Sequence, residues 1–221
     1  MARRKKAVEE VIQEEVIGSP SKAVEIPPAD LSPYLTKEAI NYFKKRTEMH
    51  IALVRKYAHH IEKAFPIYSG LYQNSAKHDD LKFQEPERSP YIVLSWKKKI
   101  ENSGREFQIP EDVKDAIWKA TEHHIKNSPH HPEYFQDKNL GLLNKNDRDG
   151  IPEVAIDATL MPDIYVAEMV ADWMAMSEEL GTSLTGWIDK VVGKRWKFSE
   201  KQKGIIDEIV GFFKLSKALA G

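Results

Sequence analysis

Apolar residues recur at three- and four-residue spacing along most of the chain, which is the period of an amphipathic helix. The clearest case is residues 36–64. Thr36 is a suitable N-cap for this helix, and Pro66 lies just beyond its end. One face of the helix would carry Ile40, Phe43, Thr47, His50, Val54, Tyr57 and Ile61. The pattern therefore places a histidine, His50, among core positions.

Further helical segments are predicted after this one. Residues 91–100 suit a strand or a helix by local propensity, and helix is favoured because nothing nearby offers a partner strand. The predicted segments are 78–83, 91–100, 111–126, 161–180, 185–192 and 199–219. The expected fold class is therefore all-α.

Two of these helices carry ionisable residues on a face that is expected to be buried. In 111–126 the core face is expected to contain Val113, Ala116, Ile117, Ala120 and His123, and His124 fits that face nearly as well. In 161–180, Glu168 and Asp172 lie one turn apart on the same side. Ionisable groups on core-facing positions are candidates for a buried site.

The first residues differ from the rest of the chain. Residues 1–30 contain a basic cluster and the breaker run GSPSKAVEIPP, and we expect a flexible N-terminal extension there. Residues 31–221 are predicted to form a single helical domain.

Composition narrows the possible partners. Lys and Arg number 33 and Asp and Glu 34, so the net charge of -1 gives no general reason to expect nucleic acid or an anionic membrane as a partner. The basic KVVGKRWKF stretch with Trp187 and Trp196 could face nucleic acid, but a solvated amphipathic edge is favoured.

No stretch approaches about 18 consecutive apolar residues, so no transmembrane helix is expected. Nothing in the sequence indicates an oligomeric state.

The chain contains no cysteine. A transition-metal site must therefore use imidazole and carboxylate ligands, which suit Mn, Fe, Zn, Co or Ni. The absence of cysteine also fits a reducing cytoplasm, where we expect the protein.

All eight histidines lie between His50 and His131. A single histidine on a core face is usually structural, so the argument rests on the combination. His59 and His60 lie off the apolar face and are expected at the surface. The remaining candidates share core-facing or clustered positions and are joined by two acidic residues: His50, His78, Asp79, His123, His130, His131 and Asp172. Burying several such groups is costly unless a cation compensates them, which points to a metal site.

The order His, His-Asp, Asp resembles the HD-domain superfamily of metal-dependent phosphohydrolases. The resemblance implies an HD-like helical bundle and a first metal held by His50, His78, Asp79 and Asp172. Some HD proteins hold two metals. The ligands of a second metal would here be His123, His130 and His131, with Asp79 as the bridging carboxylate.

The chain also resembles an uncharacterised family of small HD-like proteins common in bacteria and phages. Three blocks carry this resemblance and occur in the family's order: HDDLKF from His78 to Phe83, HHIKNSPHHPEY from His123 to Tyr134, and EMVADW from Glu168 to Trp173. Asp80 and Leu81 depart from the Leu-Ser of the family, which leaves the ligands intact but puts the local helix start in doubt.

The resemblance implies hydrolysis of a nucleotide or another small phosphate ester with one or two divalent ions. Lys82 could neutralise the phosphate or be a surface lysine. Glu168 could orient a ligand, accept a proton or simply pair with a basic group. Two other functions stay open: a di-iron oxygenase that uses the same type of ligands, and a non-catalytic binding protein that a metal stabilises. The choice of His123 over His124 also stays open.

Overall fold

The computed structural model describes residues 29–136 and 150–220, with side chains up to residue 215. Most of the predicted extension, residues 1–30, lies outside the described residues. Seven α-helices and two short strands are present in the described ranges, which confirms the all-α class. The helices are α1 (Lys37–Ala64), α2 (Leu71–Asn74), α3 (Arg88–Asn102), α4 (Glu111–Asn127), α5 (Asp163–Leu180), α6 (Leu184–Val191) and α7 (Glu200–Ala220). Short 3₁₀ helices lie between them: η1 (Ser32–Tyr34), η2 (Pro66–Tyr68), η3 (Ser75–Lys77), η4 (Asp80–Phe83) and η5 (Pro132–Phe135).

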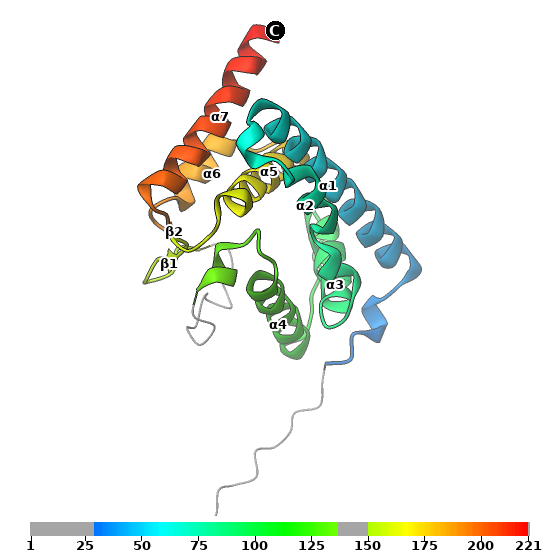
Figure 1. Ribbon diagram of the computed structural model, residues 1–221. Coiled ribbons are helices and arrows are strands. Elements are labelled where there is room, and N and C mark those ends of the chain that lie inside the picture. Colours follow the sequence, from blue (N-terminus) through cyan, green and yellow to red (C-terminus); the bar gives the residue numbers. More distant parts are fainter. Residues whose placement is uncertain (1–28, 137–149, 221) are drawn as a thin grey trace, which may run out of the picture.

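Helix α5 is the centre of the fold. It packs against α1, α2, α6 and α7, and Figure 1 shows it between α1 and α7. Apolar residues occur nearly all round this helix, as expected for a helix that is covered on several sides. Its fully buried residues include Val166, Ala167, Val170 and Ala171. The largest apolar core therefore forms around α5.

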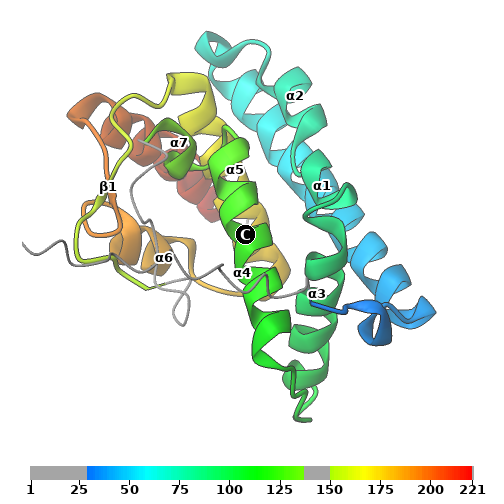
Figure 2. The ribbon, with the colours of Figure 1, turned by 90° about the horizontal axis from the view of Figure 1, so that it is seen from below.

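A second, smaller core lies where α1 and α4 each pack against α3. Figure 2 shows α3 and α4 side by side, with α1 along the other side of α3. Phe43, Ile92 and Ala120 contribute one residue from each helix to this core. On α1, His50 lies between Phe43 of this core and Val54 of the larger one. The two cores thus leave a buried polar layer between them.

Most predicted helices agree with the structure to within about three residues. Thr36 is confirmed as the N-cap of α1, because its hydroxyl accepts a hydrogen bond from the amide of Ala39 at 3.2 Å. None of the described helices is long and apolar enough to cross a membrane.

The prediction of a helix over residues 78–83 is wrong at its start. The 3₁₀ helix η4 begins at Asp80, and His78 and Asp79 precede it. Asp79 has the left-handed backbone conformation, with φ of 62°. Few residues besides Gly, Asn and Asp adopt this conformation easily, and it interrupts a right-handed helix. The turn directs His78 and Asp79 inward, and both are almost fully buried.

The basic segment near Trp196 is amphipathic, as the sequence favoured: Lys190, Lys194 and Lys197 are exposed, but Arg195 and Trp196 are drawn inward. β1 (Ile156–Asp157) pairs in parallel with β2 (Trp196–Lys197). Arg195 and Trp196 are each only 5% exposed. The Trp196 indole donates a hydrogen bond to the buried Glu133 carboxylate at 3.0 Å, and its ring stacks on that of Trp173. A buried hydrogen-bond acceptor thus draws this end of the segment into the fold.

Candidate metal centre

Five parts of the chain contribute side chains to the polar layer. His50 comes from the middle of α1, His78 and Asp79 from the turn before η4, and Asp172 from α5. The other members follow one another in sequence: His124 from the last turn of α4, and His130 and His131 from the loop before η5. We call these seven residues the His/Asp cluster.

Asp79 lies at the centre of the cluster. Its Oδ1 is 3.1 Å from His124 Nε2, and it is 3.8 Å from His130 Nε2 and 4.0 Å from His78 Nε2. Its Oδ2 is 3.8 Å from His50 Nε2. One carboxylate is therefore shared among four imidazoles, which is the position that a carboxylate bridging two ions would occupy.

Asp172 reaches the cluster from α5. Its Oδ1 is 3.0 Å from His50 Nε2 and 3.8 Å from His78 Nε2. The four residues that the sequence predicted for a first metal, His50, His78, Asp79 and Asp172, thus lie together.

Only part of the ligand set predicted for a second metal lies together. Each of three groups has candidate ligand atoms that all lie within 4.8 Å of one another: His50, His78 and Asp79; His124, His130 and His131; and His78, His130 and Glu168. The second group contains His124 in place of the predicted His123. The buried His, Asp and Glu side chains can therefore hold a metal ion.

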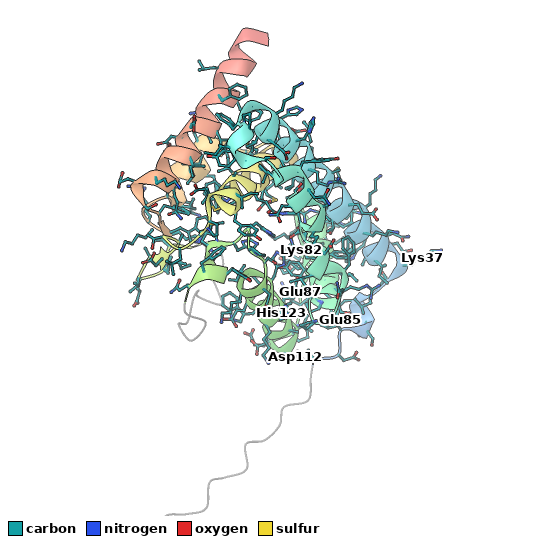
Figure 3. The ribbon with its side chains drawn as sticks, viewed as in Figure 1. Lys37, Lys82, Glu85, Glu87, Asp112 and His123 are labelled. Carbon is teal, nitrogen blue, oxygen red and sulfur yellow. The ribbon has the colours of Figure 1, made fainter. Side chains whose placement is uncertain are left out.

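His123 is the predicted ligand that the structure does not place in the cluster. Its side chain is 37% exposed and its Nδ1 is 2.8 Å from Glu87 Oε1. His124, one residue later, is buried and lies against Asp79. Neighbouring helix positions differ by about 100° in direction, so only one of the pair can face the interior. Figure 3 shows His123 near Glu87, where α3 and α4 meet.

Several buried polar atoms of the cluster have no hydrogen-bond partner among the described residues. They are His50 Nδ1, His78 Nε2, His124 Nε2 and Asp79 Oδ1. An unsatisfied buried polar atom is rare in folded proteins and unfavourable. Imidazole nitrogens that converge on a carboxylate oxygen form the donor set of a transition-metal ion. The residues present therefore fit a bound metal.

Three further carboxylates contact the Nδ1 atoms of histidines in the cluster. Glu168 Oε1 is 3.2 Å from His78 Nδ1, Glu87 Oε2 is 2.9 Å from His124 Nδ1, and Glu179 Oε2 is 3.4 Å from His50 Nδ1. In each case the opposite nitrogen of the same ring faces Asp79 or Asp172. Histidines that bind metals usually carry such a carboxylate on their second nitrogen, which fixes the tautomer and the ring orientation.

The surroundings also set the protonation states that ligation needs. Burial, together with neighbouring histidines, holds the pKa of His130 and His131 well below the usual range, so both are neutral. Burial alone would raise the pKa of Asp79, but Lys82 and nearby histidines hold it well below its usual value. Burial would lower the pKa of His50, yet the neighbouring carboxylates of Asp172 and Glu179 raise it to about 9. A cation at the cluster would replace the proton of His50.

The two predicted catalytic residues lie on different sides of the cluster. Lys82 Nζ is 2.6 Å from Asp79 Oδ2, and its side chain remains 20% exposed. Glu168 is almost fully buried behind His78, where its Oε2 also accepts a hydrogen bond from the Asn74 amide at 2.6 Å. The position of Glu168 is that of a residue that orients a ligand.

A pocket of about 320 Å³ reaches the cluster from outside. Six members of the cluster, all except His78, line this pocket. Lys82, Arg46 and Lys98 add positive charge to its wall, and Trp173, Trp187 and Trp196 add aromatic surface. A small molecule in the pocket would therefore touch the cluster and basic side chains at the same time.

The sequence interpretation missed several contributors. Glu179 is seven residues after Asp172, so helical periodicity could have placed it on the same face of α5. Arg46, which lies 2.7 Å from Glu179, is likewise one turn from His50 on α1. Glu87 gave no such signal, because it lies between Pro86 and Pro90 in a segment without helical periodicity.

None of the curated proteins and none of the solved structures compared with the chain matches it. One family model does match, and its description gives no function. The match covers residues 39–211, a span that contains the whole His/Asp cluster, and the chain therefore belongs to the family of unknown function DUF5662.

Proposed function

We propose that the chain is a metal-dependent phosphohydrolase of the HD type, acting on a small phosphate ester. The observation that carries the proposal is that six of the seven candidate metal ligands line one pocket together with Lys82. A purely structural metal site is normally closed by its protein ligands, whereas a catalytic site keeps room for water and substrate. The pocket therefore favours catalysis over a structural role for the metal.

The donor set identifies the residues that would hold the ions. His50, His78, Asp79 and Asp172 would hold one ion, and His124, His130 and His131 would hold a second with Asp79 between the two. A divalent ion of this type supplies an activated water nucleophile and a Lewis acid for a phosphoryl oxygen.

The chain's own residues would bind and orient the substrate. Lys82 is held beside Asp79 and its Nζ lies 5.2 Å from the centre of the Tyr91 ring, so its charge stays at the wall of the pocket. Burial alone would lower the pKa of Lys82, but the Asp79 carboxylate raises it above the usual value, which keeps the amino group charged. It can then bind an oxygen of an incoming phosphate. Glu168, Glu87 and Glu179 would keep three imidazoles in fixed orientations.

Metal analysis tests the first half of the proposal. Protein purified without added metal is expected to contain a divalent transition metal, and His78→Ala and Asp172→Ala are expected to lose most of it. His59→Ala is the matched control, because His59 is exposed and lies outside the cluster. Equal metal contents in the wild type and both cluster variants would contradict the metal site.

Turnover tests the second half. With added Mn²⁺, the wild type is expected to release phosphate from a panel of nucleoside monophosphates and 4-nitrophenyl phosphate. Asp79→Asn, which keeps a residue suited to the left-handed backbone, should reduce this release by at least about a hundredfold. Phosphate release that survives in Asp79→Asn would count against the proposal. An oxygen-dependent optical change in iron-loaded protein, without phosphate release, would favour the di-iron oxygenase instead.

A further inference from the structure

Two helices form a continuous wall of the pocket beyond the His/Asp cluster. Each contributes a single face with the spacing i, i+3, i+4, i+7. The residues on α1 are Phe43, Arg46, Thr47 and His50, and those on α3 are Tyr91, Leu94, Ser95 and Lys98. The wall thus starts at the cluster and continues along both helices.

Both faces run in the same direction away from the metal ligands. Tyr42 of α1 lies against Trp96 of α3, with ring centres 5.9 Å apart, and Lys99 Nζ lies 4.6 Å from the centre of the Tyr42 ring. The start of α1 is therefore beside the end of α3. Arg46 is four residues, about 6 Å along the axis, from His50. Lys98 is about 10 Å along α3 from Tyr91, whose ring lies near His124.

The far end of this wall has the chemistry of an anion-binding site. Arg46 Nε contacts Glu179. The Arg46 side chain is still 31% exposed and lines the pocket. Lys98 is exposed. Each of these two cations has a buried hydroxyl group nearby on its own helix: Thr47 directly follows Arg46, and Ser95 lies three residues before Lys98. Guanidinium, ammonium and hydroxyl groups are donors that bind carboxylate and phosphate oxygens.

We propose that this end of the pocket binds a second anionic group of the substrate. The substrate class would then be a phosphate ester with a further carboxylate or phosphate one to two helical turns from the group at the metal cluster. The inference rests on the proposed function, because it assigns the first phosphate to the His/Asp cluster. Lys98 and Arg46 would be residues that determine specificity.

A pair of probes that differ in one charge tests the inference. Metal-loaded protein is titrated calorimetrically with 4-carboxyphenyl phosphate and with phenyl phosphate. The wild type is expected to bind the carboxylated probe about fivefold more tightly, which is the effect of one favourable contact between partly exposed charges. In Lys98→Gln the ratio of the two affinities should fall close to one. Raising the salt concentration should shrink the ratio in the wild type.

Lys97→Gln is the matched control. Lys97 is the preceding residue of α3, pairs with Glu101 and does not line the pocket, so the ratio should keep its wild-type value. Metal content of each variant, measured alongside, shows that the cluster is intact.

The two proposals fail in different ways. Equal affinities for both probes in the wild type, no binding of either, or an unchanged ratio in Lys98→Gln would overturn the second anion site. Phosphate release is measured separately on the same probes. Tighter binding of the carboxylated probe without phosphate release would support the anion site and contradict the phosphohydrolase. Phosphate release from both probes with equal affinities would support the phosphohydrolase and contradict the anion site.

Discussion

Three histidines of the cluster, His50, His78 and His124, have separate contacts at their two ring nitrogens. In His124, Nε2 lies toward Asp79 and Nδ1 toward Glu87, and His78 and His50 repeat this arrangement with Glu168 and Glu179. A ring that is held at both ends cannot turn away from the cluster. The geometry at the scale of single residues is therefore set in advance of metal binding.

The choice between His123 and His124 can be decided by substitution. His124→Ala is expected to lose a large part of the bound metal, because it removes an imidazole that lies against Asp79. His123→Ala should retain the metal, since His123 is partly exposed and its ring contacts Glu87 Oε1 rather than Asp79. Metal content and the metal dissociation constant are the measurements. Retention by His124→Ala together with loss by His123→Ala would reverse the assignment.

Glu87 provides a second test at this scale. Glu87→Gln keeps the shape of the side chain but weakens its interaction with His124, and the affinity for metal should fall by about 10- to 100-fold. Glu85→Gln is the control, because Glu85 is exposed and bonds to Ser89 rather than to a histidine of the cluster. Figure 3 shows both glutamates near the start of α3. An unchanged metal affinity in Glu87→Gln would remove the supporting role of this carboxylate.

The sequence predicted much of this cluster. His50 stood out because it occupies a core position on a long periodic helix, and Asp172 because it is a carboxylate in an apolar helix. Periodicity cannot separate two adjacent residues when the helix phase is uncertain by one position. The spacing of His123 from Asn127 and from the histidine pair matches the family pattern, and this spacing favoured the wrong residue of the two. Glu87 lies in a proline-rich turn, where no repeat exists to indicate which side chains face inward.

At the scale of elements, the helices follow the apolar pattern closely, because burial of one face decides where most of them begin and end. The strands β1 and β2 were not predicted. Each has only two residues, which is too short for an alternating pattern, and they are far apart in sequence. Their pairing depends on tertiary contacts such as the hydrogen bond between Trp196 and Glu133.

Helix α7 allows a matched test of how burial stabilises an element. Ile209 is fully buried in the core around α5, whereas Leu215 on the same helix is 68% exposed. Ile209→Ala is expected to lower the free energy of unfolding by about 2–5 kcal/mol. Leu215→Ala should change it by less than about 0.5 kcal/mol. Urea unfolding of both variants measures the difference, and similar losses would contradict the packing of α7 against α5.

At the scale of the whole molecule, the cluster joins the two apolar cores. Without a cation, several imidazoles and carboxylates are buried together with unsatisfied atoms. A metal that binds only the folded state stabilises it in proportion to the logarithm of its concentration relative to the dissociation constant. The stability of the molecule is therefore expected to depend on metal.

Removal of the metal by a chelator should lower the melting temperature. At a free metal concentration a hundred times the dissociation constant, the contribution is about 2.7 kcal/mol. For a chain of this length that corresponds to roughly 5–10 °C. Calorimetry with and without EDTA measures the shift, and added Mn²⁺ or Zn²⁺ should restore it. The same melting temperature in both conditions would show that the cluster folds without a cation.

The sites of the cluster are spread from α1 to α5, so an ion bound there would act as a cross-link between distant segments of a chain that has no cysteine. Secreted proteins commonly obtain such cross-links from disulfides, which respond to the redox potential. Here the cross-link would respond to metal supply instead. Starvation for metal would then loosen the fold as reduction loosens a disulfide-bonded protein, and resistance to proteases would report the metal status of the cell.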